Sequence, residues 1–171
     1  RRCVWRIETV SETGAFDRLL LHAVQYGWRR HTGELVEGGG NVDDMQELVA
    51  HELAHQWFGD TVTMKWFDDL WLKEGFAEFM AYKTLAQVMP EYNAWKIFYE
   101  RNKQLAYLTD STKGTTPIYQ EIPNLSAAKS AYGNIVYNKA PSFLRQAEFY
   151  LGEKEFKIAV RSFLKKNEFK N

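Results

Sequence analysis

Cysteine is almost absent from the sequence: Cys3 is the only one among 171 residues. A single thiol cannot form a disulfide within the chain, and it favours a reducing compartment such as the cytoplasm. Charge of one sign is also lacking, because Lys plus Arg and Asp plus Glu both total 22. With no net field to attract an anion, we expect no nucleic-acid partner.

Long apolar runs are missing too, since none approaches the roughly 20 residues of a membrane-spanning helix. We therefore expect no membrane segment in this chain. An initiating methionine and a signal peptide are likewise absent, and the chain opens abruptly with RRCVWRIETV. That opening suggests a fragment of a longer multidomain protein, whose other domains would be its partners.

What is present suits one packed domain spanning residues 1–171, with 45% hydrophobic and 15% aromatic residues. Residues 1–10 alternate as a short strand does, and residues 61–68 alternate in the same way. Apolar residues at helical spacing predict five later helices and one near the start. The predicted helices span residues 16–30, 43–57, 68–89, 93–108, 131–151 and 153–166. The fold class is mainly α (α+β) with a short N-terminal β element.

One short stretch within the helix expected at residues 43–57 carries chemistry: HELAH, residues 51–55. Positions i and i+4 share a helix face, so His51 and His55 can direct two imidazoles at one metal ion. Glu52 is turned by about 100° from His51 and could hold a water without ligating the metal. This is the arrangement of a general base, although a polar helix can also produce the pattern by chance.

A third ligand separates these two interpretations. Glu74 follows His55 with eighteen residues between them, inside WLKEGFAEF on the next predicted helix. A helix, a turn and an antiparallel return bring such a residue back beside the first helix. His51, His55 and Glu74 then form a His₂Glu set, the type that holds one Zn²⁺ in catalytic zinc peptidases.

HELAHQWFGD followed by WLKEGFAEF at this spacing resembles the zinc aminopeptidase family of gluzincins, which includes alanyl aminopeptidases and leukotriene hydrolase. The resemblance continues through YGNIVYNKAPSFLRQAEFYLGEKEF and covers roughly residues 45–170. It implies a thermolysin-like catalytic domain that hydrolyses peptides. Tyr137 stands two residues before Lys139, in the place of the family's catalytic tyrosine, whose phenol can donate to an oxyanion.

The chain departs from the family pattern at two places. The family's Gly-x-Met-Glu-Asn segment binds the substrate's free α-amine, and here GAFDR stands in its place, at residues 14–18. Asp17 would then be the amine-binding acid, or an ordinary acid at a helix N-terminus. Ala140 replaces the usual glycine after the lysine.

Glu78 lies one turn after Glu74 on the same predicted helix face. Its carboxylate could hydrogen-bond a metal-binding imidazole from behind, or it could be a solvated helix acid. We expect the aromatic residues around the two motifs to form core rather than to contact substrate. These residues are Trp57, Phe58, Trp66, Phe67, Trp71, Phe76 and Phe79.

Together these observations predict a zinc metallopeptidase that removes N-terminal amino acids from peptides. In this hypothesis Glu52 is the general base and Tyr137 stabilises the oxyanion. Two alternatives stay open. One is a zinc endopeptidase, or a peptidase of altered specificity, that lacks amine recognition. The other is an inactive zinc-binding interaction domain.

Overall fold

The computed structural model describes residues 42–170, and these residues are mainly helical, as predicted. The predicted strand at residues 1–10, the predicted helix at residues 16–30 and Asp17 lie outside the described residues. The elements in chain order are α2 (Val42–Ala54), η2 (Phe67–Asp69), α3 (Leu70–Val88), η3 (Pro90–Tyr92), α4 (Ala94–Ile97), η4 (Phe98–Lys103), α5 (Gln104–Asp110), α6 (Leu125–Ala131), η5 (Ile135–Lys139), α7 (Ala140–Leu151) and α8 (Glu153–Asn167).

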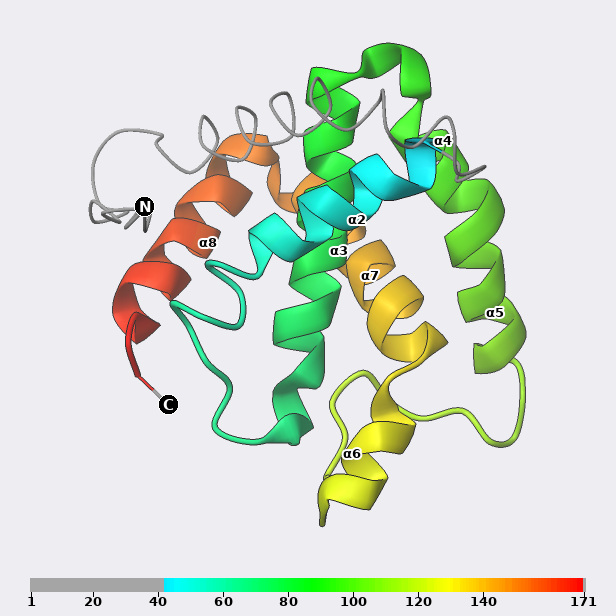
Figure 1. The fold of residues 1–171 in the computed structure, drawn as a ribbon, viewed down its shortest axis with the longest axis vertical. Helices are drawn as coiled ribbons and strands as arrows, with labels where there is room; N and C mark the ends of the chain where they lie inside the picture. Colours follow the sequence, from blue (N-terminus) through cyan, green and yellow to red (C-terminus); the bar gives the residue numbers. More distant parts are fainter. Residues whose placement is uncertain (1–41, 171) are drawn as a thin grey trace, which may run out of the picture.

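Helix α3 is the centre of the fold. In Figure 1 α2 crosses it and α7 runs beside it, with α4 and α5 on one side and α8 on the other. Helix α3 packs against α2, α4, η5 and α7. Apolar and polar side chains are buried over most of its length, as expected of a helix surrounded by others. It ends before Pro90, because proline cannot continue a helix.

Aromatic rings form much of the core between α3 and its neighbours. The Phe58 and Phe76 rings stack with their centroids 4.7 Å apart, and Phe79 meets Phe156 of α8 at 5.5 Å. The predicted aromatic core is therefore confirmed at Phe58, Phe76 and Phe79, which are all buried. Trp66 is different: it is 42% exposed, and its indole nitrogen donates to the carbonyl of Ile122 at 2.6 Å.

Three predicted elements differ from the structure. The helix expected at residues 93–108 is continuous but changes to π-helical winding in η4 before α5. The helix expected at residues 131–151 is preceded by a separate α6, which begins where Asn124 accepts a hydrogen bond from the Ala127 amide at 2.9 Å. Residues 61–68 form no strand, and only an isolated bridge joins Phe58 to Val62.

Within residues 42–170, no helix combines the length and the apolar character needed to cross a membrane.

Candidate metal centre

Two imidazoles converge at the C-terminal end of α2. The amide of His55 bonds the carbonyl of His51 at 3.3 Å, which keeps the two residues one helical turn apart. Their Nε2 atoms lie 3.1 Å from each other, and their rings are nearly perpendicular, at 86°. The i, i+4 spacing therefore does bring both ring nitrogens to one point.

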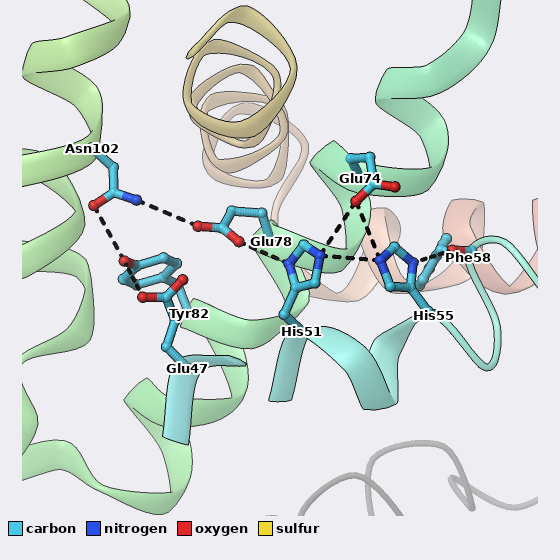
Figure 2. A network of polar contacts seen from close by, with 8 residues as sticks. All are labelled: Glu47, His51, His55, Phe58, Glu74, Glu78, Tyr82 and Asn102. Carbon is cyan, nitrogen blue, oxygen red and sulfur yellow. Dashed lines mark hydrogen bonds and ion pairs between the residues drawn. The ribbon is translucent and has the colours of Figure 1, made fainter. Parts of the chain in front are cut away.

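Glu74 reaches the same point from α3, which α2 crosses (Figure 2). Its Oε2 atom is 3.4 Å from Nε2 of His51 and 3.3 Å from Nε2 of His55. Glu74 and His51 are both buried, with 4% and 7% of their surfaces exposed. The structure thus groups all three predicted ligands as one candidate metal-binding set.

The hydrogen bonds behind the two imidazoles decide which nitrogen faces inward. Nδ1 of His55 lies 2.9 Å from the carbonyl oxygen of Phe58, which can only accept, so Nδ1 carries the hydrogen. Nδ1 of His51 lies 2.8 Å from Oε2 of Glu78 and donates to that carboxylate. In the neutral rings both Nε2 lone pairs therefore point at Glu74, and three acceptors face one another with no hydrogen between them.

Such a set of acceptors fits a zinc ion. Ligands bound about 2.0–2.1 Å from a tetrahedral ion lie about 3.3–3.4 Å from one another. The three distances here are 3.1, 3.3 and 3.4 Å. Two nitrogens and one oxygen suit zinc rather than calcium or magnesium, which prefer oxygen ligands alone. Three protein ligands would leave one tetrahedral position free.

The pKa shifts of His51 and Glu74 show that their surroundings favour positive charge. Burial acts to lower the pKa of His51, but hydrogen bonds to Glu74 and Glu78 and their negative charges outweigh it and raise that pKa to about 9. Burial acts to raise the pKa of Glu74, but hydrogen bonds with His51 and His55 hold it well below its usual range. These shifts favour the charged imidazolium of His51 and the charged carboxylate of Glu74.

Tyr137 approaches from η5, which packs against α3. Its ring centroid is 6.1 Å from that of His51. Burial, together with the negative charge of Glu74 and a hydrogen bond with it, raises the pKa of Tyr137 above its ordinary value. The phenol therefore keeps its hydrogen at neutral pH and can donate it.

Contacts with the end of α5 fix the π-helical turn that carries Tyr137. Nδ2 of Asn134 donates to the hydroxyl of Thr109 at 2.9 Å, and Nζ of Lys139 donates to Oδ1 of Asp110 at 2.8 Å. These two bonds bracket Tyr137 in the sequence. They link its position to α5.

A close helix contact brings Tyr137 toward Glu74. A Cβ atom on Gly75 would lie 2.7 Å from Cβ of Ala140 and 3.2 Å from the Val136 carbonyl oxygen. Only a glycine at position 75 lets η5 and the start of α7 come this near to α3. Ala140, which departs from the family's glycine, is accommodated because its methyl group lies against Gly75.

Two further predicted residues, Glu52 and Glu78, lie beside the three candidate ligands. Glu52 is exposed on α2 beside His51, and its role as base stays a prediction. Glu78 lies behind His51 and is buried, in keeping with the first of its two predicted roles and not with a solvated helix acid. The sequence analysis missed Glu47, Tyr82 and Asn102, which extend this polar network (Figure 2).

Two of these three residues obey a readable spacing. Glu47 precedes His51 by four residues on α2, and Tyr82 follows Glu78 by four residues on α3. The same i, i+4 rule that pairs the histidines could therefore have found both. Asn102 had no such signal, because it lies in the π-helical segment η4.

Comparison with known proteins agrees with this geometry. The model of the peptidase family M1 domain matches residues 37–171. A leucyl aminopeptidase of Saccharolobus solfataricus is 43% identical over 125 residues, which are 73% of this chain and 16% of that protein. Aminopeptidase M1-D of Oryza sativa subsp. japonica is 42% identical over 123 residues, which cover 72% of this chain and 14% of that protein.

A third relative is the tricorn protease-interacting factor F2 of Thermoplasma volcanium, 39% identical over 123 residues, which cover 72% of this chain and 16% of that protein. The chain therefore spans less than a fifth of the length of the curated relatives that it matches. The family match begins at residue 37, so the GAFDR segment at residues 14–18 lies outside it. The resemblance to the zinc aminopeptidases is confirmed at the level of the family.

Proposed function

Because the chain belongs to peptidase family M1, we propose that it hydrolyses peptide bonds with one Zn²⁺ held by His51, His55 and Glu74. The observation that carries this proposal is the triangle of three converging acceptors, whose sides match the edges of a zinc tetrahedron. The aminopeptidase names of the relatives support release of N-terminal amino acids. The substrate is then a peptide with a free α-amine.

The bound zinc would polarise the scissile carbonyl and lower the pKa of water at its free position toward about 7. Glu52 follows His51 on α2 and takes the proton of the attacking water, then passes it to the leaving amine. Tyr137 keeps its phenolic hydrogen and donates it to the oxyanion that develops on the substrate. Glu78 holds the His51 ring in the tautomer whose Nε2 faces the metal.

We propose a thermolysin-like catalytic domain for residues 1–171, with the N-terminal strand at residues 1–10. Further domains of the same protein are the proposed partners, because the relatives are much longer than this chain. Asp17 is the proposed contact for the substrate's α-amine. An endopeptidase without that contact is the second candidate, because the GAFDR segment departs from the family pattern and lies outside the match.

Hydrolysis of an aminoacyl-arylamide, with and without a chelator, tests the proposal. Activity should disappear with the chelator and return with zinc. Glu52→Gln should keep the metal and lower kcat by about 10²–10⁴-fold, because it removes the base and no ligand. Zinc binding without any hydrolysis by wild-type protein would instead identify an inactive metal-binding domain.

Blocked peptides separate the two peptidase candidates. An aminopeptidase should cleave a peptide with a free amine and leave its N-acetylated form intact. Asp17→Asn should then raise KM for the free peptide. Equal cleavage of both peptides would favour the endopeptidase.

A further inference from the structure

Four buried or half-buried polar residues lie behind His51, on the side away from the metal position (Figure 2). They come from three segments: Glu47 from α2, Glu78 and Tyr82 from α3, and Asn102 from η4. We propose that these residues form one positioning network, in which Asn102 orients Glu78 and Glu78 in turn orients the ligand His51. This inference rests on the proposed zinc site and names residues outside the ligand set that tune it.

Glu78 is the central member because each of its oxygens faces a different donor. Oε2 accepts from Nδ1 of His51 at 2.8 Å, and Oε1 accepts from Nδ2 of Asn102 at 3.4 Å. Two donors at opposite oxygens restrict rotation of the carboxylate plane. Since Glu78 is only 5% exposed, water cannot readily replace either donor.

Tyr82 and the carboxylate of Glu78 together favour one orientation of the Asn102 amide. Its hydroxyl lies 3.3 Å from Oδ1 of Asn102, and this contact leaves Nδ2 directed at Glu78. A flipped amide would place its oxygen against the carboxylate, which accepts only. Burial and the negative charges of Glu47 and Glu78 raise the pKa of Tyr82, so its hydroxyl stays a donor.

Glu47 ends the network with a carboxyl group whose pKa is raised. Its Oε2 lies 3.1 Å from the Tyr82 hydroxyl. Burial, then the negative charge of Glu78 and a hydrogen bond with it, raise the pKa of Glu47 to about 7, against the opposing effects of Tyr82 and His51. Two buried carboxyl groups so close cannot both be charged at little cost. Glu47 therefore holds a proton more readily than an ordinary glutamate does, while a carboxyl oxygen of Glu78 faces His51.

The π-helical winding of η4 gives Asn102 its place. A π-helix has more residues per turn than an α-helix, so residues after its start face new directions. Asn102 is half-buried and is the one network member that comes from outside α2 and α3. Through Asn102, the α4–η4–α5 helix contacts Glu78, which in turn bonds His51.

Zinc affinity of the full chain tests this network, measured by competition with a coloured chelator. Asn102→Leu removes both amide contacts and should weaken zinc binding by about tenfold, the lower end of the range for residues that orient metal ligands. Asn102→Asp keeps the shape and the acceptor for Tyr82 but removes the donor to Glu78, so it should weaken binding at least as much. Gln104→Leu is the matched control, because this exposed amide donates to the Tyr99 carbonyl at 3.2 Å and is not one of the network residues.

Co²⁺ substitution provides a readout that a merely structural role would not change. The Co²⁺ absorption spectrum should shift in both Asn102 variants and stay as in wild type for Gln104→Leu.

The outcomes separate this inference from the proposed function. If wild-type protein binds zinc and both Asn102 variants bind it as tightly as Gln104→Leu does, the network is overturned and the zinc site stands. The same holds if those variants only lower the melting temperature of the metal-free protein. If wild-type protein binds no zinc, the proposed site and the network both fail.

Discussion

The metal centre takes its residues from two kinds of helix. Helices α2 and α3 have regular α-helical winding and carry His51 and Glu74, together with Glu52 and Glu78, and the third candidate ligand, His55, directly follows the end of α2. The segments η4 and η5 are π-helical, and they supply Asn102 and Tyr137. His51 and His55 are related by i, i+4 spacing, whereas each π-helical segment contributes one polar group.

This difference teaches how the tasks are divided. A tetrahedral ion needs several donors within about 3.3 Å of one another, and one face of a regular helix provides two of them. A side chain that donates to an oxyanion, or that orients a metal ligand, needs only to point at one partner. The extra residue of a π-helical turn changes such a direction, and π-helical turns are often found at functional sites.

The largest effect that this comparison predicts comes from removing the Tyr137 hydroxyl on η5 while α2 and α3 stay unchanged. This variant tests whether η5 contributes to the chemistry separately from the ligand helices. Tyr137→Phe should lower kcat by about 10²–10³-fold, the loss found when one oxyanion donor is removed. Zinc content should stay at the wild-type value, because no ligand changes. Steady-state kinetics and metal analysis on the same sample check both parts. A kcat near that of wild type would show that η5 has no chemical role.

A second test fills the close contact between α3 and the start of α7, which positions η5. Gly75→Ala places a methyl group against Ala140, so it should destabilise the protein by about 1–3 kcal/mol and lower kcat through displacement of Tyr137. Urea unfolding measures the free-energy change. Gly75→Ala combined with Ala140→Gly relieves the closest clash and should recover part of the stability. A double variant no better than Gly75→Ala would contradict the close contact.

The smallest predicted effect concerns Glu47, the residue of α2 at the end of the polar network. The pKa of Glu47 is raised to about 7 from 4.5, so between these values the folded chain holds a proton that the unfolded chain releases. Stability from this group is therefore greatest at low pH and falls as pH rises through the folded pKa. Urea unfolding of metal-free protein at about pH 5 and about pH 6.5 should show that fall, less steep in Glu47→Gln. If the free energy of unfolding changes equally with pH in wild type and Glu47→Gln, the pKa of Glu47 is not raised.

The sequence predicted the regular part of the site well. His51, His55, Glu74 and Glu78 follow from i, i+4 spacing on helices that the apolar pattern also predicts. The mainly α fold class was predicted in the same way. The family match covers these residues, and their roles stay predictions.

What could not be predicted has a common physical cause. Residue preferences do not show where an α-helix takes up an extra residue, so nothing in the sequence indicated that Asn102 would face Glu78. The position of Tyr137 followed from resemblance alone, because its approach depends on Gly75 and on contacts with the end of α5. The alternation in residues 61–68 predicted a strand wrongly, since in the described residues no neighbouring strand is there to pair with it.

The central claim is that α2 and α3 together hold a single ion. Metal analysis of the purified protein, wild type beside His51→Ala, tests it most directly. We predict about one zinc per chain for wild type and near none for His51→Ala, because two remaining ligands seldom hold zinc tightly. A His51→Ala protein with the zinc content of wild type would contradict the account.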